Sequence, residues 1–199
     1  MSAVLVVCTG NVCRSPMAEG FLRAALERRF GGAAPLVSSA GTVGWEGSGA
    51  MQESVEAAAE RGIDIADHVA RRLDAGMTAS ADLIVCMAGE HRDAVEALDP
   101  PAAVRAFTLK ELTGLLESSG DGRTGSPEDL PGRVAVADEL RRRAASPGPW
   151  DEDIVDPLGS PPSVYRAVAW ELDTWIERLV AATFGPAERA DDPAIPEAL

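Results

Sequence analysis

Short apolar runs alternate with helix-like segments along most of the chain. The runs at residues 3–7 and 81–87 are largely apolar and rich in β-branched side chains, which is typical of parallel strands buried on both faces. Residues 36–39 and 104–108 predict two further strands. Because helical segments separate these strands, the pattern indicates an α/β fold with a parallel sheet.

Apolar side chains recur at helical spacing between and after the strands. In the last predicted helix, Val168, Leu172, Ile176 and Leu179 form one stripe. Pro16 suits the first turn of the first helix, where a backbone N–H would have no partner. The predicted helices cover residues 15–30, 51–61, 90–98, 109–117 and 163–184.

The composition changes between residues 118 and 150, where Gly, Pro, Ser and charged residues dominate. We interpret this stretch as an insertion with one amphipathic helix over 133–145. Loops of this length are usually functional or mobile. Its position just before Asp156 suggests a gate or a partner-binding element. We expect residues 1–184 to form a single domain and the Pro- and Asp-rich residues 185–199 to form a loose tail.

Composition and charge narrow the function classes. The chain has 199 residues, of which 46% are hydrophobic and 25% charged, as in ordinary globular proteins. Its net charge of -14 argues against nucleic acid or an anionic membrane as a partner, since both attract basic surfaces. No apolar run approaches the roughly 20 residues of a membrane span. Three cysteines, two of them in one short loop, argue against a disulfide scaffold and favour the reducing cytoplasm.

A distinctive loop, Cys8-Thr9-Gly10-Asn11-Val12-Cys13-Arg14-Ser15, follows the first strand and precedes the first helix. Backbone N–H groups and a helix N-terminus can form an anion-binding nest in such a loop. Arg14 adds a planar, permanently charged fork that can hold two phosphate oxygens. These positive groups favour the thiolate of Cys8, a nucleophile, and Ser15 can donate a hydrogen bond to its sulfur. The pattern predicts phosphoryl transfer through a cysteine.

The loop resembles the signature of the low-molecular-weight protein-tyrosine phosphatase family, in the form Val7-Cys8-x-Gly10-Asn11-x-Cys13-Arg14-Ser15-Pro16. The resemblance implies a four-stranded parallel sheet with helices on both faces, of the flavodoxin-like kind, and no metal or other cofactor. It also implies a phosphorylated protein as substrate, with phosphate or vanadate as ligands of the loop. Further matching segments are Ser39-Ala40-Gly41-Thr42, Gly62-Ile63-Asp64, His68-Val69-Ala70-Arg71, Ala81-Asp82-Leu83-Ile84, Met87, Asp156-Pro157 and Tyr165.

Expulsion of a phenolate, whose conjugate acid has a pKa of about 10, requires a proton donor. The residues alone leave four candidates open: Asp151, Glu152, Asp153 and Asp156. The resemblance assigns the role to Asp156, first as the acid for the leaving group and then as the base that activates water. The structural alternative is that Asp156 serves as a turn or cap residue.

The resemblance also implies roles for residues around the loop. Asn11, Ser39 and His68 would brace it by hydrogen bonds, and Trp45 would either flank the substrate ring or pack as a lid. Cys13 is either a small buried residue or the partner of Cys8 in a protective disulfide under oxidation. The expected phosphate-binding and supporting residues are Thr9, Gly10, Asn11, Val12, Cys13, Ser15, Ser39 and His68.

Other reactive or charged side chains are expected to be structural. Cys86 lies in an apolar strand and is predicted to belong to the core, and His91 is predicted to lie on a solvated helix face. The run Arg141-Arg142-Arg143 is interpreted as the solvated face of the helix in the insertion.

Two substrate classes remain open within the family. Relatives that hydrolyse phosphoarginine have a threonine at the position of Val12, whereas a larger branched apolar residue there suits phosphotyrosine. Val12 and an aromatic wall at Trp45 therefore favour phosphotyrosine. The lack of tyrosines after Asp156-Pro157, and the segment Phe107-Thr108-Leu109-Lys110-Glu111, are closer to the arginine-phosphatase branch.

Two other classes share this loop. An arsenate reductase with a thiol relay needs further cysteines near the nucleophile, and beyond Cys13 the chain offers Cys86 alone. A silent phosphate-binding module would lack the nucleophile, the arginine or the acid, and none is missing here. We therefore predict a protein-tyrosine phosphatase, with a protein-arginine phosphatase as the alternative.

Overall fold

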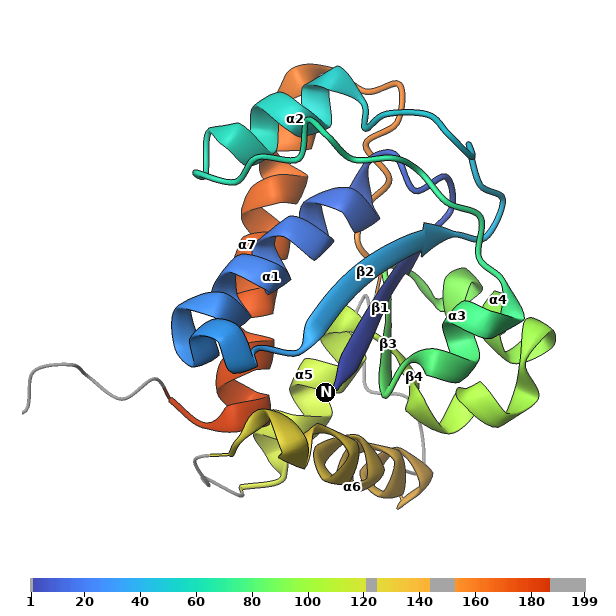
Figure 1. Cartoon of the computed structure of the whole chain (residues 1–199), viewed down its shortest axis with the longest axis vertical. Helices are drawn as coiled ribbons and strands as arrows, with labels where there is room; N and C mark the ends of the chain where they lie inside the picture. Colours follow the sequence, from blue (N-terminus) through green and yellow to red (C-terminus); the bar gives the residue numbers. More distant parts are fainter. Residues whose placement is uncertain (1, 121–124, 144–152, 187–199) are drawn as a thin grey trace, which may run out of the picture.

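The computed structural model describes residues 2–120, 125–143 and 153–186. It contains a four-stranded parallel sheet in the order β2-β1-β3-β4, formed by β1 (Ala3–Cys8), β2 (Leu36–Gly41), β3 (Leu83–Cys86) and β4 (Ala106–Thr108). Because the strands run in one direction, their carboxyl ends meet at one edge of the sheet (Figure 1). The predicted parallel sheet is confirmed. None of the described helices is long and apolar enough to cross a membrane.

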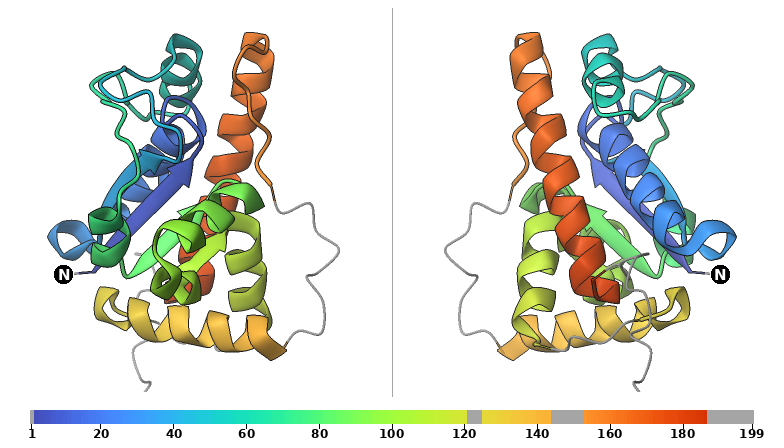
Figure 2. Two further views of the ribbon diagram at one scale, coloured as in Figure 1. Left: turned by 90° about the vertical axis from the view of Figure 1, so that its right-hand side faces the viewer. Right: turned by 90° about the vertical axis from the view of Figure 1, so that its left-hand side faces the viewer.

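Helices lie on both sides of the sheet, as predicted (Figures 1 and 2). One side carries α1 (Arg14–Phe30), α2 (Gln52–Ala59), α5 (Leu109–Ser118) and α7 (Pro162–Phe184), and α7 packs against the other three. The opposite side carries α3 (Ala75–Ser80) and α4 (Gly89–Leu98), which the 3-10 helix η2 (Pro100–Arg105) connects to β4.

The side chains of β1 alternate between two apolar cores. Val4 and Val6 belong to the larger core, beneath α1, α5 and α7, whereas Leu5 and Val7 belong to the smaller one, beneath α3 and α4. Both faces of the strand are therefore removed from water, which explains why every position of the run is apolar. Fully burying one such side chain contributes about 1.5–3 kcal/mol.

Three elements differ from the sequence prediction. The helix predicted over 133–145 begins at Leu130, and residues 144–145 lie outside the described residues. Residues 104–105 belong to η2 and not to β4, because Pro100 and Pro101 lack the N–H groups of a sheet ladder and Val104 is exposed to solvent. The short helix α3 was not predicted, since Thr78 is its one buried residue and no apolar stripe marks it.

The described part of the insertion lies at the amino ends of the strands. It forms the 3-10 helix η3 (Pro127–Asp129) and α6 (Leu130–Arg143). The hydroxyl of Ser2 donates to the carbonyl of Pro127 (2.8 Å), and Leu130 and Val134 join the larger core. Cys8 lies at the other end of β1, so α6 lies away from the loop. A gating role of the insertion stays a prediction.

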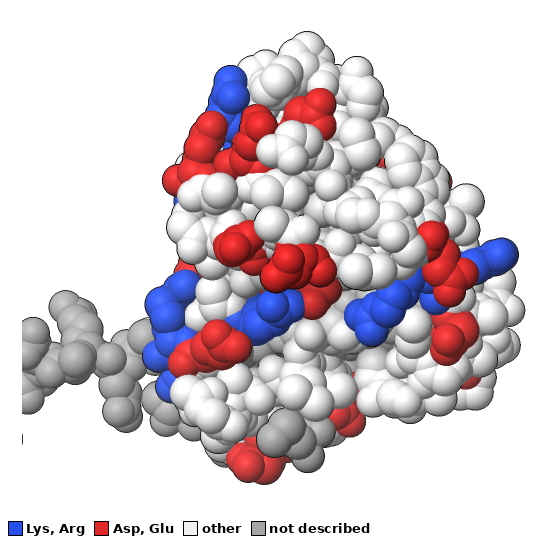
Figure 3. Space-filling model, turned by 45° about the horizontal axis from the view of Figure 1, so that its top comes forward, with Lys and Arg blue, Asp and Glu red and all other residues white. Residues whose placement is uncertain are grey.

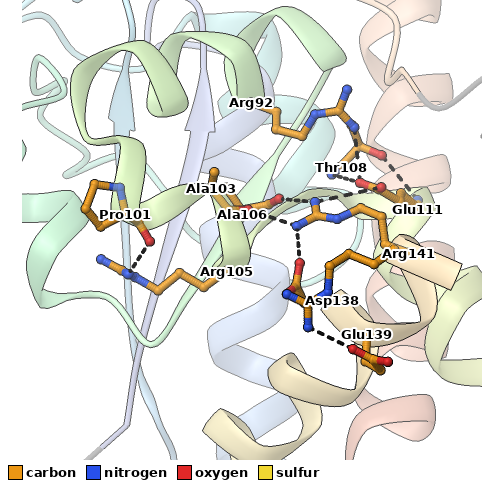
Figure 4. Close-up of polar contacts among 11 residues, drawn as sticks. Arg92, Pro101, Ala103, Arg105, Ala106, Thr108, Glu111, Asp138, Glu139 and Arg141 are labelled. Carbon is orange, nitrogen blue, oxygen red and sulfur yellow. Dashed lines mark hydrogen bonds and ion pairs between the residues drawn. The ribbon is translucent and has the colours of Figure 1, made fainter.

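Arg141 anchors α6 to β4 (Figure 4). Its guanidinium donates to the carbonyls of Ala106 (2.8 Å) and Ala103 (2.9 Å). It also lies 4.1 Å from the centre of the Phe107 ring, and Asp138 of the same helix holds it at 2.8 Å. These contacts fasten the insertion to the sheet.

The prediction of a solvated arginine run is therefore wrong for its first member. The guanidinium of Arg141 turns away from solvent because it donates to backbone carbonyls in η2 and at the start of β4. Arg142 and Arg143 are solvated as predicted, with side chains 61% and 72% exposed.

Candidate active site

The loop between β1 and α1 sits at the carboxyl edge of the sheet. Cys8 ends β1 opposite Gly41 of β2, and the carbonyl of Cys8 accepts the N–H of Thr42 (2.9 Å). A Cβ atom at position 41 would lie 2.7 Å from the carbonyl oxygen of Thr9 and 2.9 Å from the nitrogen of Asn11. Glycine at this position therefore lets the loop pass directly over β2.

Asn11 is the centre of the hydrogen bonds that hold the loop. Its φ of 57° is in the left-handed region, which asparagine tolerates better than most residues. Its Oδ1 accepts the N–H of Arg71 (2.8 Å), which fixes Nδ2 as the donor to Ser15 (2.8 Å) and Ser39 (2.8 Å). Nε2 of His68 lies 2.8 Å from the carbonyl oxygen of Asn11.

These contacts place the expected bracing residues around the loop. The hydroxyl of Ser39 accepts a hydrogen bond from Asn11 and donates one to the carboxylate of Glu19 (2.6 Å). His68 holds the backbone of the loop and belongs to no metal-ligand cluster in the part of the chain that the structure describes. The loop is thus held from β2, α1 and the segment before α3, which limits its movement.

The sulfur of Cys8 lies 2.9 Å from the hydroxyl oxygen of Ser15. Because Ser15 accepts a hydrogen bond from Asn11, its own hydrogen is available for the sulfur. When Cys8 is a thiolate, it can only accept, so Ser15 is then the donor in this contact. A hydroxyl donor stabilises a thiolate more than a thiol, since charged acceptors form the stronger bonds.

Arg14 is 4% exposed and lies at the start of α1. Its Nη1 donates to the carbonyl of Ile154 (3.1 Å), and its Nη2 donates to the Thr9 hydroxyl (3.1 Å) and to Oδ2 of Asp156 (2.6 Å). Its Nε is buried and has no hydrogen-bond partner among the described residues. A buried cationic donor without a partner favours an anion at this place.

The structure separates the candidate acids. Asp156 contacts Arg14 and is 42% exposed, so it is open to a ligand in the loop. Asp153 instead accepts the N–H of Gly89 at the start of α4 (2.8 Å). Asp151 and Glu152 lie outside the described residues. The N–H of Ile154 donates to the carbonyl of Met87 (2.8 Å), which ties the Asp156 segment to the end of β3.

His91 is a site residue that the sequence prediction missed. Its side chain is 1% exposed, and its Nε2 lies 2.9 Å from the Thr9 hydroxyl oxygen. Burial, and then the charge of Arg14, lower the pKa of His91 from 6.5 to about 4. The predicted solvated face is wrong because the first turn of α4 follows β3, whose carboxyl end adjoins that of β1. Residues in the first turn after β3 are therefore expected to lie near the loop after β1, and this is the signal that could have identified His91.

Trp45 lies beside the loop and is 44% exposed. Its backbone N–H donates to the carbonyl of Gly10 (3.2 Å), and a Cβ atom at Gly10 would lie 3.9 Å from its indole ring. Val43, Val155 and Leu158 are exposed in neighbouring loops. These exposed apolar side chains lie in segments that border the loop and Asp156, and such side chains suit contact with an aromatic or aliphatic substrate group.

Val12, Cys13 and Cys86 are all buried. Cys8, Cys13 and Cys86 are free thiols in this structure, and burial raises the pKa of Cys13 to about 11. Burial also raises the pKa of Cys86, which lies in the smaller core as predicted. A Cys8–Cys13 disulfide under oxidation stays a prediction.

Charges are mixed on the face shown in Figure 3. Basic and acidic side chains alternate there in a band, next to a broad uncharged surface. The guanidinium of Arg14 is 4% exposed, so its positive charge lies below the surface of a chain whose net charge is -14.

The comparisons with known proteins agree with this geometry. The family model for low molecular weight phosphotyrosine protein phosphatase matches residues 3–121. A probable low molecular weight protein-tyrosine-phosphatase, EpsP of Ralstonia solanacearum, is 40% identical over 114 residues, which are 56% of this chain and 73% of the relative. A protein-arginine-phosphatase of Geobacillus stearothermophilus is 32% identical over 176 residues, 88% of this chain and 92% of the relative.

A solved structure shows the same fold. The low molecular weight protein tyrosine phosphatase of T. tengcongensis is 34% identical, with a TM-score of 0.67, and the match covers 90% of this chain and 98% of that one. The chain therefore belongs to the low molecular weight phosphotyrosine protein phosphatase family and is a phosphatase.

Proposed function

We propose that the protein hydrolyses phosphotyrosine in protein substrates through a covalent intermediate on Cys8. The observation that carries this proposal is the convergence of Cys8, Ser15, Arg14 and Asp156 on one loop, with Cys8 Sγ 2.9 Å from Ser15 and Arg14 2.6 Å from Asp156. Residues 1–184 would act as a single phosphatase domain. The free cysteines of the site agree with a location in the reducing cytoplasm.

Phosphate binding would use the loop backbone and Arg14. The backbone N–H groups of the loop would form an anion nest, and the Nε of Arg14 supplies a donor that has no partner within the described ranges. The same site would bind inorganic phosphate and vanadate. Arg14 would neutralise charge that develops on the equatorial oxygens during transfer.

In the first step, the thiolate of Cys8 attacks phosphorus and the bond from phosphorus to the phenolic oxygen breaks. Asp156 gives its proton to that oxygen, so that tyrosine leaves as a neutral phenol. The exposed carboxyl of Asp156 at the rim of the loop suits contact with the leaving group.

In the second step, the carboxylate of Asp156 takes a proton from water, whose oxygen attacks phosphorus. The bond between sulfur and phosphorus breaks, and Cys8 leaves as a thiolate that accepts the hydrogen of Ser15. Inorganic phosphate is released, and Asp156 is protonated again for the next cycle.

Phosphotyrosine is supported by the exposed apolar side chains near the loop and by Val12. Trp45 and its exposed neighbours offer surface for an aromatic ring, and Val12 brings no hydroxyl to the loop. A protein-arginine phosphatase is the second candidate, because the relative named so matches 88% of this chain, including the segment around Asp156. The same residues would then break a bond from phosphorus to nitrogen.

Arsenate reduction has less support. Cys8 and Cys86 face different cores on opposite sides of the sheet, and Cys86 is fully buried. Among the described cysteines, Cys13 therefore remains as the candidate for exchange with Cys8.

The substrate proposal is tested with peptides of one sequence that carry either phosphotyrosine or phosphoarginine. We expect kcat/KM to be at least about tenfold higher for phosphotyrosine, which corresponds to about 1.4 kcal/mol in transition-state binding. The variant Cys8→Ala should hydrolyse neither peptide. A preference for phosphoarginine of similar size would overturn the choice of substrate but leave the mechanism in place.

A further inference from the structure

We propose that His91 is a positioning residue for the phosphate loop: it holds the Thr9 hydroxyl so that this group fixes Arg14 and keeps its own hydrogen for a bound phosphate oxygen. The inference rests on the proposed function for its chemistry. It assigns a role to a buried side chain from α4, an element that contributes no group to the proposed chemical steps.

The geometry joins three side chains at one oxygen. Oγ1 of Thr9 lies 2.9 Å from Nε2 of His91 and 3.1 Å from Nη2 of Arg14. The same Nη2 contacts Asp156 at 2.6 Å. His91 is fixed by its backbone, whose N–H donates to the carbonyl of Ala88 (3.2 Å) at the start of α4. The imidazole therefore reaches the loop from a rigid element.

The protons can be assigned from the donors and acceptors present. Arg14 can only donate, so Thr9 Oγ1 accepts one bond from it. If Nδ1 of His91 carried the proton, Nε2 would consume the Thr9 hydrogen, and a buried Nδ1–H would remain without a partner among the described residues. Buried N–H groups of that kind are rare, and each costs about 1–3 kcal/mol.

The other tautomer leaves no buried N–H without a partner. Among the described residues only the acceptor lone pair of Nδ1 then stays unpaired. With the proton on Nε2, His91 donates to Thr9, and the Thr9 oxygen accepts twice. Glu90 Oε1 lies 3.4 Å from the same nitrogen, which also favours a proton there. The pKa of about 4 keeps the ring neutral above mildly acidic pH, so a single N–H is present. The Thr9 hydrogen is then free for an anion in the loop.

The test compares His91→Phe, which keeps an aromatic ring but removes the donor, with His91→Gln, whose Nε2 can restore it. Titration with inorganic phosphate gives the Kd, and p-nitrophenyl phosphate gives kcat/KM. We expect His91→Phe to weaken phosphate binding and to lower kcat/KM by about 10- to 100-fold, as for loss of one donor to a charged site. His91→Gln should recover most of both quantities.

A double-mutant cycle with Thr9→Val separates positioning from packing. If His91 acts through Thr9, His91→Phe should have little further effect on phosphate binding in the Thr9→Val background. Additive effects, or unchanged phosphate affinity in His91→Phe, would overturn the proposal. If His91→Phe does not fold, His91→Leu, which is smaller and also removes the donor, takes its place with the same expected results.

Failure of the proposed function gives a different result. If the wild-type protein bound phosphate but did not turn over p-nitrophenyl phosphate, the proposed chemistry would be wrong. Phosphate titration of the four proteins of the double-mutant cycle would still show whether His91 and Thr9 position the anion site.

Discussion

Oδ2 of Asp156 lies 2.6 Å from Nη2 of Arg14, although 142 positions separate the two residues in the chain. The contact joins the loop after β1 to the segment that follows the insertion. It brings the proposed acid beside the proposed phosphate-binding arginine. Arg14 can then hold the phosphate oxygens while Asp156 protonates the leaving-group oxygen. The match to the family model ends at residue 121, so this contact extends the site beyond it.

The effect of removing Asp156 should depend on the leaving group. Asp156→Asn keeps the shape of the side chain but cannot give up a proton. We expect kcat to fall by about 10²- to 10⁴-fold for phenyl phosphate, whose leaving group needs protonation. Steady-state assays with a series of substituted phenyl phosphates measure the trend. The deficit should shrink as the leaving group becomes more acidic, and an equal deficit throughout would contradict the acid role.

Gly41→Ala should damage the loop, because a Cβ atom there would lie within 2.7–2.9 Å of backbone atoms of the loop. Overpacking of this kind costs about 1–3 kcal/mol, and the shifted loop should also lose phosphate affinity. Urea unfolding and phosphate titration check both effects. The matched control is Gly49→Ala, where the nearest atom would lie 3.9 Å away. Similar behaviour of the two variants would contradict the close approach.

Arg141→Met should lower stability and leave the chemistry intact. The variant keeps the apolar stem but loses the bonds to the carbonyls of Ala103 and Ala106. We expect a loss of about 2–3 kcal/mol in the free energy of unfolding, with kcat/KM unchanged for folded protein. Arg143→Met, at an exposed position of the same helix, should change stability by less than about 0.5 kcal/mol. Equal effects of the two substitutions would show that Arg141 does not anchor α6.

His91 should make the wild-type protein sensitive to mild acid. Its pKa is 6.5 in the unfolded chain and about 4 in the folded one, so below pH 6.5 the unfolded state takes up a proton that the native state does not. Stability contributed by the neutral ring is therefore lost as pH falls from 6.5 toward 4. Arg14, Asp153 and Asp156 face the ring and remain in a His91→Gln variant.

Urea unfolding at pH 7 and pH 5 measures this effect. Between these pH values the wild type should lose about 2 kcal/mol more than His91→Gln, because one pKa unit corresponds to about 1.4 kcal/mol. The other titrating groups are common to both proteins and cancel in the difference. Equal losses would show that His91 is not buried in its neutral form.

The sequence predicted those parts of the site that are contiguous. Cys8, Arg14 and Ser15 lie within one loop, and the strand and helix around them carry clear apolar patterns. The choice of Asp156 over Asp153 needed the resemblance to the family, since the geometry that separates them depends on tertiary contacts of β3 and α4.

Other features were not predictable because they depend on packing between distant elements. His91 lies two residues inside α4, and its neighbours Glu90 and Arg92 suggest a solvated face. Its burial follows from the adjacency of β1 and β3. Arg141 likewise lies in a run of charges, and the carbonyls that attract it come from residues 35 and 38 positions away.

In the proposed mechanism the phosphoryl group is transferred to the sulfur of Cys8 before it reaches water. The most direct test is to mix wild-type protein with p-nitrophenyl phosphate in the presence of EDTA, quench within the first turnovers, and map phosphorylated peptides by mass spectrometry. We expect one phosphoryl group on the sulfur of Cys8, with turnover and labelling both absent in Cys8→Ala. Turnover that survives in Cys8→Ala, or a phosphoryl group on another residue of wild type, would contradict the account.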